Sequence, residues 1–242
     1  IAVNDAGDIF VFDGQAQELR QYDAEGRFVQ ILGGQGEGPG EYRDASLGLA
    51  VRSDGRLIMR DPRNRRLNLY NQDGSFSDQW DLNSGLFTRQ SLFLGKNDHL
   101  YQKILTGRPE RNKPWPVALL HLDEQGSVVD TLRPPTLPGE PTSSGGRFGP
   151  DKTWTFSPEG YFVAGVNESY TFRLYKSEEN VVQIERAYTP IPLLPDERRE
   201  HEALNDWYRE YQSQHMTSDI PPLPNEKPPY KNLTVDERGR IW

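Results

Sequence analysis

Arginine is the residue type whose spacing in this sequence suggests chemistry. Arg63, Arg65 and Arg66 lie in one predicted loop, and Arg108 and Arg111 lie in the next. A guanidinium group can bind a carboxylate or a phosphate through two parallel hydrogen bonds. The candidate binding residues are Arg43, Arg63, Arg65, Arg66, Arg108, Arg111, Trp115 and Arg147. They predict a site for an acidic sugar, a peptide carboxylate or an acidic protein patch, and the alternative is solvated loop charge without a partner.

A glycine-rich stretch, GGQGEGPGEY at 33–42, invites comparison with phosphate-binding loops. It lacks the Gly-Lys-Ser/Thr ending of a P-loop and does not open a helix. Glycine permits backbone conformations closed to other residues, and proline fixes the chain direction, so we interpret the stretch as a tight crossing between two repeats. Its structural residues are Gly36, Gly38, Pro39 and Gly40. The carboxylates of Glu37 and Glu41 are then available to line a channel entrance.

A 48-residue internal repeat indicates which elements must carry these residues. The stretch IFVFD at 9–13 recurs as LIMRD at 57–61, and LRQYD at 19–23 recurs as LNLYN at 67–71. Each repeat holds four short apolar segments, which we name strands a to d from the inside outward, separated by Asp/Gly turns. Such a period predicts four-stranded blades that pack on one another in a β-propeller. A β-sandwich or an up-and-down barrel is the alternative, and the recurrence of turn, strand and Asp positions at one fixed offset favours the propeller.

The predicted fold is therefore all-β, of the six-bladed β-propeller type, with four blades, the start of a fifth and one helix near 196–214. We treat 1–242 as one partial propeller domain whose ends both look cut, since Ile1 is not an initiator methionine. The predicted blades are 1–47, 48–90, 91–151, 152–186 and 233–242, and a helical and Pro-rich insertion occupies 187–232.

Two motifs resemble a known family. Residues 61–67, DPRNRRL, are similar to the D-x-x-N-x-R-(I/V/L) core of NHL-type propeller repeats, and the 33–42 crossing resembles a junction common in bacterial six-bladed propellers. The resemblance covers the first two blades well and the fourth fairly, whereas the third lacks the Asp and Arg markers. It implies six blades and export to the periplasm or cell surface. It does not imply one activity, because relatives include protein-binding, nucleic-acid-binding and carbohydrate-related modules.

The long connections all fall on one predicted face of the propeller. They are 33–46, 106–116, 134–152 and 187–232, whereas the a–b and c–d turns of the other face are minimal. Variable loops on a rigid scaffold are where binding function tends to lie. The last connection contains a predicted helix with an aromatic stripe, which either packs on the propeller rim or serves as a lid or a partner-binding helix. The stripe consists of Leu204, Trp207, Tyr208 and Tyr211.

Composition restricts the partners. The formal charge of −8 argues against broad affinity for nucleic acid, so no nucleic-acid partner is expected. No apolar run reaches the roughly 20 residues that cross a bilayer, so no transmembrane segment is predicted. The absence of cysteine excludes disulfides and thiolate metal sites and leaves the compartment open.

We expect a non-enzymatic scaffold that binds a protein or a small acidic or carbohydrate ligand on the loop-rich face, without catalytic residues, metal or cofactor. The four histidines show no metal-ligand spacing, and H-E-x-x-H and G-x-S-x-G are absent. The alternative is a metal-dependent lactonase or hydrolase resembling gluconolactonase-type propellers, with a divalent cation held by Glu, Asn and Asp in the central channel. The predicted inner strands carry few carboxylates, which counts against that alternative.

Overall fold

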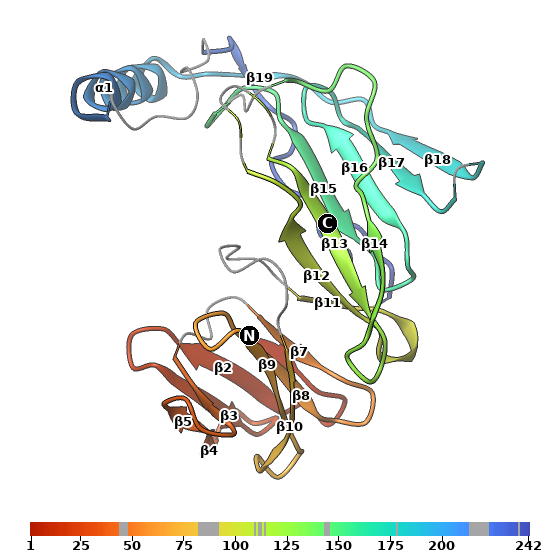
Figure 1. The fold of residues 1–242 in the computed structure, drawn as a ribbon. Helices are drawn as coiled ribbons and strands as arrows, with labels where there is room; N and C mark the ends of the chain where they lie inside the picture. The colour runs from red at the N-terminus through yellow and green to blue at the C-terminus, as the bar shows by residue number, and fades with distance from the viewer. Residues whose placement is uncertain are drawn as a thin grey trace. The chain divides into compact units, whose positions relative to one another are not determined.

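The computed structural model confirms the all-β propeller prediction (Figure 1). The residues that it describes form four four-stranded antiparallel sheets, two short strand pairs and one α-helix. The described residues are 1–43, 48–81, 92–108, 110, 113, 115–142, 146–177, 179–212, 223–236 and 238–242.

The chain divides into two compact units. The first comprises Ile1–Thr106 and Val117–Arg133, and the second comprises Gly107–Pro116 and Pro134–Trp242. The first unit holds blades one to three, and the second holds blade four, the helix and the C-terminal segment. The assignment of 1–242 to one propeller domain stays a prediction.

Blade one follows the predicted strand order. It consists of β1 (Ala2–Val3), β2 (Ile9–Asp13), β3 (Glu18–Tyr22) and β4 (Phe28–Leu32). The turn between β3 and β4 shows why Asp and Gly recur in the sequence. The Oδ1 atom of Asp23 accepts the backbone N–H groups of Glu25 and Arg27, while Gly26 adopts a positive φ of 78°. An aspartate that satisfies its own turn and a glycine in the left-handed region close the hairpin.

Blade two is covered on both faces. It consists of β7 (Leu49–Val51), β8 (Leu57–Asp61), β9 (Arg66–Tyr70) and β10 (Phe76–Asp81). Every residue of β8 and β9 is buried. Leu57, Met59 and Tyr70 pack with core residues of blade one, whereas Ile58 and Leu69 pack with those of blade three. Alternate side chains on each strand therefore belong to two different cores, which is why these strands read as apolar on both faces.

Blade three completes the first unit. It consists of β11 (Leu92–Leu94), β12 (Leu100–Leu105), β13 (Val117–Leu122) and β14 (Val128–Leu132). The innermost strand of blade two, β7, touches both β1 and β11, as expected when the first strands of neighbouring blades line a propeller axis. The short segment η1 (Lys96–Asp98) joins β11 to β12, and its residues Asn97 and Asp98 have positive φ angles of 57° and 60°. Two consecutive left-handed residues are what a tight type I′ hairpin turn requires.

Blade four forms the sheet of the second unit. It consists of β15 (Lys152–Phe156), β16 (Phe162–Val166), β17 (Thr171–Tyr175) and β18 (Val181–Glu185). Leu233 and Val235, the predicted start of a fifth blade, pack against its core. Val235 and Ile241 form one antiparallel bridge, so the C-terminal segment is a hairpin.

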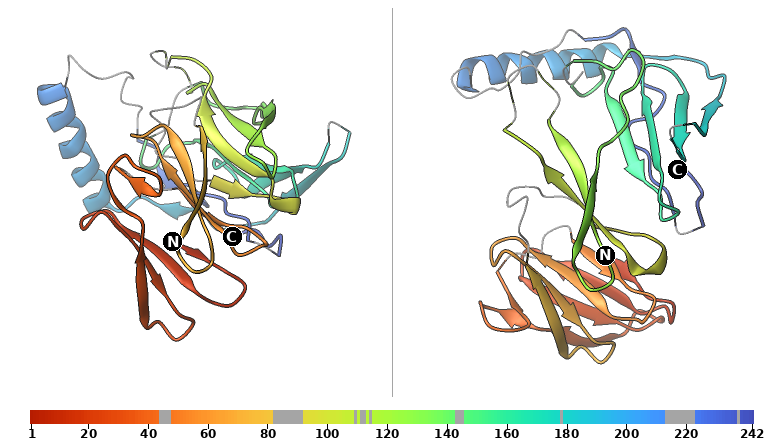
Figure 2. Two further views of the ribbon diagram at one scale, coloured as in Figure 1. Left: turned by 60° about the horizontal axis from the view of Figure 1, so that its bottom comes forward. Right: turned by 45° about the vertical axis from the view of Figure 1, so that its right-hand side comes forward.

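The long insertion contains the predicted helix. The helix α1 (Pro195–Gln212) lies between β19 (Ile191–Pro192) and β20 (Glu226–Lys227), which pair with each other. Figure 2 shows α1 extending beyond the sheet of blade four in the same unit. Of its predicted stripe, Leu204 and Trp207 are 43% and 46% exposed, so neither is buried, and the rim, lid and partner-binding roles of the stripe stay predictions. The side chains of Tyr208 and Tyr211 lie outside the described residues. No helix among the described residues is long and apolar enough to cross a membrane.

Candidate functional site

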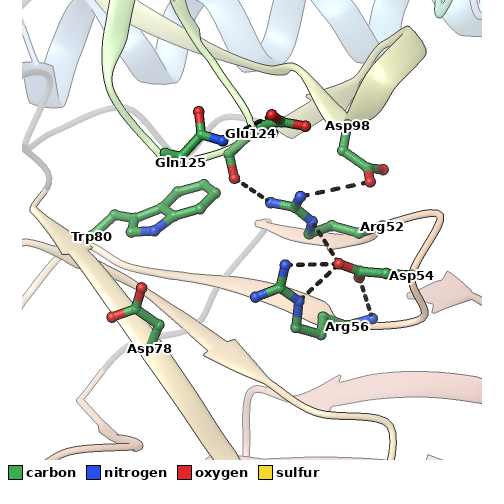
Figure 3. Close-up of a pocket in the computed structure, with 8 residues that line it drawn as sticks. All are labelled: Arg52, Asp54, Arg56, Asp78, Trp80, Asp98, Glu124 and Gln125. Carbon is green, nitrogen blue, oxygen red and sulfur yellow. Dashed lines mark hydrogen bonds and ion pairs between the residues drawn. The ribbon is translucent and has the colours of Figure 1, made fainter.

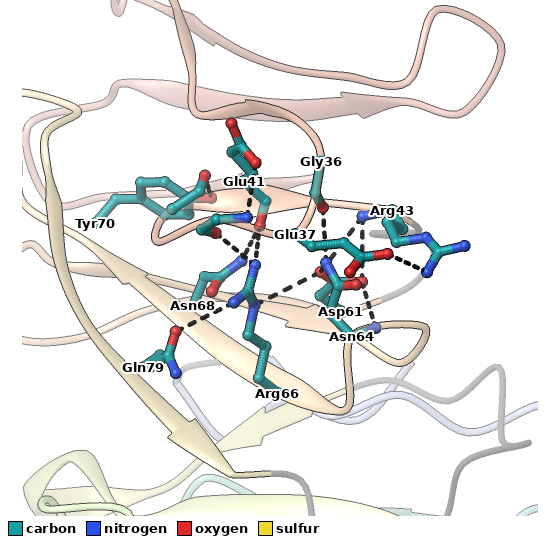
Figure 4. Close-up of polar contacts among 12 residues, drawn as sticks. Gly36, Glu37, Glu41, Arg43, Asp61, Asn64, Arg66, Asn68, Tyr70 and Gln79 are labelled. Carbon is teal, nitrogen blue, oxygen red and sulfur yellow. Dashed lines mark hydrogen bonds and ion pairs between the residues drawn. The ribbon is translucent and has the colours of Figure 1, made fainter.

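The glycine-rich crossing between blades one and two is held by one face of β9. Side chains at alternate positions of this strand reach the same carbonyl groups (Figure 4). Arg66 Nη2 donates to the carbonyl of Glu41 at 2.8 Å, and Asn68 Nδ2 donates to it at 2.9 Å. The hydroxyl of Tyr70 donates to the carbonyl of Gly40 at 2.7 Å. The crossing is thus part of the framework of blade two.

Further hydrogen bonds to the backbone hold the crossing. The carbonyl of Gly36 accepts Asn64 Nδ2 at 2.8 Å, and the N–H of Gly38 donates to Glu41 Oε2 at 2.7 Å. Pro39 is exposed at the bend. The crossing also forms two parallel two-residue strands, β5 (Gly34–Gln35) and β6 (Glu41–Tyr42).

Gly40 is a position where only glycine fits. Its φ is 74°, and a Cβ atom there would lie 2.9 Å from the Cβ atom of Phe76. A larger residue would meet both a strained backbone and a steric clash.

Asp61 and Arg66 also contact the backbone of the crossing and of the loop before β9. The carboxylate of Asp61 is fully buried and lies 3.9 Å from Arg66 Nε. It accepts hydrogen bonds from Asn64 Nδ2 at 2.7 Å and from the backbone N–H of Arg43 at 3.3 Å. Arg66 is 8% exposed, and its guanidinium also donates to the carbonyl of Gly38. A guanidinium committed to buried carbonyl groups cannot bind a ligand as well. We therefore correct the sequence-based set and remove Arg66 from the binding residues.

Two predicted binding arginines stand on the loop that this network fixes. Arg63 and Arg65 are exposed, and the side chain of neither has a hydrogen-bond or ion-pair partner among the described residues. Arg65 has a φ of 57°, and Gln17, its counterpart 48 residues earlier, has a φ of 56°. Arg43 differs, because its Nη1 atom lies 2.6 Å from Glu37 Oε1. Arg63 and Arg65 are thus the uncompensated positive charges of this loop.

The other predicted binding residues belong to the second unit or lie outside the described residues. Arg108 and Trp115 are exposed, and Arg111 lies outside the described residues. Arg147 pairs with Glu200 at 3.4 Å, and its guanidinium lies 5.0 Å from the ring centroid of Phe148. The sequence-predicted set is therefore not one cluster within either unit.

A charged cleft lies at the opposite end of blade two, among the short turns. Its volume is about 490 Å³, within the roughly 300–1,000 Å³ typical of ligand sites. It is formed by the turn between β7 and β8, by β10, by η1 and by the turn between β13 and β14 (Figure 3). The lining residues are Arg52, Asp54, Arg56, Asp78, Trp80, Asp98, Glu124 and Gln125. The sequence predicts only minimal turns at these positions, and the cleft arises where the turns of two blades meet.

Arg52 forms the floor of the cleft. Its side chain is 5% exposed, and its Nη1 atom donates to the carbonyl of Glu124 at 2.8 Å. Its Nη2 atom lies 3.6 Å from Asp98 Oδ2, and its Nε atom lies 3.5 Å from Asp54 Oδ2. Asp98 in turn accepts the N–H and the hydroxyl of Ser53 at 2.7 Å each. Arg52 thus ties the turns of blades two and three together.

Asp54 and Arg56 form a second ion pair at the side of the cleft. Arg56 Nη2 donates to Asp54 Oδ2 at 2.7 Å, and Arg56 Nε donates to the same oxygen at 2.9 Å. Partial burial by itself would raise the pKa of Asp54, but the hydrogen bonds and positive charge of Arg56 outweigh burial and lower it. Both groups are therefore charged at neutral pH.

Trp80 is a wall of the cleft and not a stacking platform. Its ring is 8% exposed, with the guanidinium of Arg52 over it at 5.9 Å from the centroid. Gly126 approaches so closely that a Cβ atom there would lie 2.2 Å from Trp80 Cδ2. A sugar ring or base therefore has no open indole face to stack on.

Two carboxylates at the rim lack a close ion-pair partner among the described residues, although the negative charge of Asp78 contributes to raising the pKa of Arg56. Asp78 and Glu124 are exposed, and neither forms an ion pair with a described residue. The lining holds four carboxylates against two guanidinium groups, an excess of two negative charges. The cleft is therefore suited to a cation and repels an anion.

The repeat contains a signal that could have revealed the cleft. Arg52 and Arg56 occupy the positions of Asn4 and Asp8 in blade one, where Asn4 Nδ2 simply donates to Asp8 Oδ2 at 3.1 Å. The turn keeps its length and its backbone hydrogen bonds but carries two arginines in place of small turn residues, which is a departure from the repeat in side chains alone. Such departures mark candidate functional positions in a repeat protein.

Candidate metal sites were expected to be absent, and the lactonase alternative would need one. Among the described residues, no group of three or more His, Asp or Glu side chains is placed to hold a metal ion. The absence of a channel metal site and of a cofactor stays a prediction.

The chain is similar in fold to several solved structures. A candidate exported protein from Bacteroides fragilis has 15% identity and a TM-score of 0.48, over 88% of this chain and 57% of that one. Virginiamycin B lyase from Staphylococcus aureus has 12% identity and a TM-score of 0.41, over 78% of this chain and 56% of that one. A candidate gluconolactonase has 12% identity and a TM-score of 0.43, over 100% of this chain and 69% of that one. The chain thus spans little more than half the length of the first two.

No curated protein matches the sequence. The sequence profile of a family described as 6-bladed beta-propeller, DUF5128, matches residues 1–146, which is more than half of the chain. The match includes all the strands of blades one to three. This chain therefore belongs to that family of six-bladed β-propellers.

Proposed function

We propose that this chain is a non-catalytic binding propeller whose cleft takes a cationic group, such as a lysine ammonium or an arginine guanidinium of a partner protein. The observation that carries the proposal is the pair of rim carboxylates, Asp78 and Glu124, which lack ion-pair partners among the described residues. They stand beside a floor whose own charges are already paired. A cation that enters the cleft completes the charge balance.

The fixed floor supports this function energetically. Arg52, Asp54 and Asp98 hold one another and the surrounding turns, so the cleft does not have to rearrange when a ligand binds. Preorganised sites lose less conformational entropy on binding. The rim groups are exposed, so each ion pair with a ligand contributes only about 0.2–1 kcal/mol and weakens with added salt.

The test uses a small cation and its uncharged analogue. The probe is N-acetyl-lysine methylamide, titrated into the ¹⁵N-labelled full chain, and the analogue has norleucine in place of lysine. We expect the lysine probe to shift the backbone signals of Asp78, Glu124 and Gln125, and the norleucine analogue to leave them unchanged. The double variant Asp78→Asn, Glu124→Gln should bind the lysine probe about three- to tenfold more weakly, since two exposed ion pairs are lost.

The matched control is Asp5→Asn, Glu202→Gln. Both residues are exposed and lie outside the cleft, and the net charge changes by the same amount. This control should bind like the wild type. Equal shifts from the norleucine analogue, or an unchanged affinity in the cleft variant, would show that the rim carboxylates do not form the site.

A second candidate function is binding of an acidic partner by Arg63 and Arg65. It is favoured by their exposure and lack of ion-pair partners among the described residues, on a loop pinned by Asp61 and Asn64. Hexaglutamate is a suitable probe. We expect Arg63→Glu, Arg65→Glu to abolish its binding, whereas Arg133→Glu, Arg238→Glu, with the same change of charge on exposed residues, should retain it. If both double variants lose binding equally, only the net charge matters.

Relationship to NHL-type repeats and export to the periplasm or cell surface belong to the same proposal. Both rest on the motifs at 33–42 and 61–67. Detection of the full-length protein in a periplasmic or cell-surface fraction tests the proposed export.

A further inference from the structure

Blade three carries a pair of histidines that no sequence motif indicated. His99 Nδ1 lies 2.6 Å from His121 Nε2, although the two residues are 22 positions apart. His99 follows η1 directly, and His121 belongs to β13. The antiparallel register of β12 with β13 brings them together, because Leu100 pairs with Leu122.

The carboxylate of Asp130 orients the ring of His121. His121 Nδ1 lies 2.9 Å from Asp130 Oδ1, and the two residues are direct cross-strand neighbours on β13 and β14. An ionised carboxylate can only accept a hydrogen bond, so the Nδ1 atom of His121 carries the proton. The Nε2 atom of the neutral ring then presents its lone pair to His99.

The ring of His121 is also held in place by packing. Tyr101 stacks on it at a centroid distance of 4.5 Å with an interplanar angle of 16°. The His121 side chain is 13% exposed, while that of Asp130 is 51% exposed. The imidazole is thus fixed on one side by an aromatic ring and on another by a carboxylate, with solvent close by.

We propose that His99 and His121 form a binding site for a late first-row divalent cation such as Zn²⁺, Ni²⁺ or Cu²⁺. Metal-binding histidines characteristically donate their other N–H to a carboxylate, which fixes the tautomer and makes the ligand nitrogen more basic, as Asp130 does for His121. Neutral imidazole suits these cations better than Mg²⁺ or Ca²⁺, which prefer oxygen ligands. The site supplies two protein ligands, and water or a partner group fills the remaining positions.

The required rearrangement is small. Zinc binds imidazole nitrogen at about 2.0–2.1 Å, so tetrahedral geometry needs the two nitrogens to lie about 3.3 Å apart. Rotation of the partly exposed His99 ring away from His121 provides this separation, and His121 keeps its contacts with Asp130 and Tyr101. The competing role is purely structural: one proton shared between two rings that tie the start of β12 to β13.

Metal titration separates the two roles. The full chain in a non-coordinating buffer at pH 7.5 is titrated calorimetrically with Zn²⁺, and long-range ¹H–¹⁵N spectra follow the imidazole nitrogens. We expect one equivalent to bind, with the signals of His99 Nδ1 and His121 Nε2 shifted. His99→Gln and His121→Gln should each abolish this binding. Asp130→Asn should weaken it about 10- to 100-fold, as for other carboxylates behind a ligating histidine.

The control variant is His215→Gln, which leaves both proposed ligands in place and should bind like the wild type. Circular dichroism and thermal melting without metal show whether each variant still folds. If His121→Gln folds and binds Zn²⁺ as well as the wild type, or if Asp130→Asn has no effect, the pair is structural only. Equal losses in His215→Gln and His99→Gln would indicate adventitious surface binding and would also overturn the proposal.

Discussion

At positions 17 and 65 the chain places a residue other than glycine in the left-handed backbone region. Gln17 and Arg65 have φ angles of 56° and 57° at the same point of the loop between the second and third strands of their blades. That backbone region costs a side-chain-bearing residue about 1–2 kcal/mol relative to the right-handed one. Since the same conformation occurs in both blades, the loop structure requires it, and it does not by itself indicate function.

Replacing Arg65 with glycine should therefore stabilise the protein. Relief of the left-handed strain is partly offset by the greater freedom of glycine in the unfolded chain, so we expect Arg65→Gly to raise the free energy of unfolding by about 0.5–1 kcal/mol. Urea unfolding followed by circular dichroism measures this difference. Arg63→Gly, on the same loop but without a positive φ, should lower stability. Equal losses from both replacements would contradict this explanation.

At the scale of elements, a turn with one backbone conformation can both close a hairpin and line the cleft of the first unit. The c–d turns after Asp23 and Asp123 share the same hydrogen bonds, in which Oδ1 accepts the N–H groups of the second and fourth residues that follow. In blade three the glycine of this turn also packs against Trp80 of blade two. The turn is therefore both a hairpin closure and a wall of the cleft.

Two glycines at the same turn position distinguish the hairpin role from the packing role. Gly126 and Gly26 have φ angles of 81° and 78°, but a Cβ atom at 126 would overlap Trp80 and one at 26 would meet open space. Gly26→Ala should cost about 1–2 kcal/mol for its backbone alone. Gly126→Ala should cost at least about 1–3 kcal/mol more, because it overpacks the interface between two blades. Equal losses in thermal or urea unfolding would mean that Trp80 moves aside without cost.

Side chains of β9 hold the glycine-rich crossing through hydrogen bonds to its carbonyl groups. The buried hydroxyl of Tyr70 donates to the carbonyl of Gly40 at 2.7 Å. Tyr70→Phe leaves that carbonyl unpaired away from water and should destabilise the protein by about 1–3 kcal/mol. Tyr175→Phe is the matched control, because the hydroxyl of Tyr175 has no partner among the described residues. Unfolding free energies that fall equally in the two variants would contradict the assigned role of this hydrogen bond.

At the scale of the whole chain, the recurrent turn aspartates link stability to pH. Hydrogen bonds from the backbone lower the pKa values of Asp13 and Asp23, and those from Ser75 lower the pKa of Asp73. At Asp236 the hydrogen bonds of its turn and of Arg240 outweigh burial and lower the pKa to about 2. In the unfolded chain the pKa of aspartate is about 3.9. Between that value and the lower pKa values of the folded state, the folded state therefore binds fewer protons than the unfolded state.

Stability should therefore be lost in acid. The contribution of these groups is fully present above about pH 4–5 and disappears as the pH falls towards their folded pKa values, with that of Asp236 lost last, near pH 2. Urea unfolding at pH 7, 5, 4 and 3 should give nearly constant free energies from 7 to 5 and a steep fall below 4. The variant Asp236→Asn should show a shallower fall. A stability that rises between pH 5 and pH 3 would be incompatible with this explanation.

The sequence by itself determined the repeat, the strands and the turns, because their causes are local: alternation of apolar residues, and Asp and Gly in tight turns. It also predicted a helix near 196–214, which starts at proline and acidic residues, and the structure has this helix at Pro195–Gln212. Tertiary structure decided which charges are available. Arg66 and Arg63 are three positions apart, yet one is buried under carbonyl groups and the other is exposed. The cleft and the pair His99 and His121 arise from blade packing and strand register, which bring together residues that no sequence spacing relates.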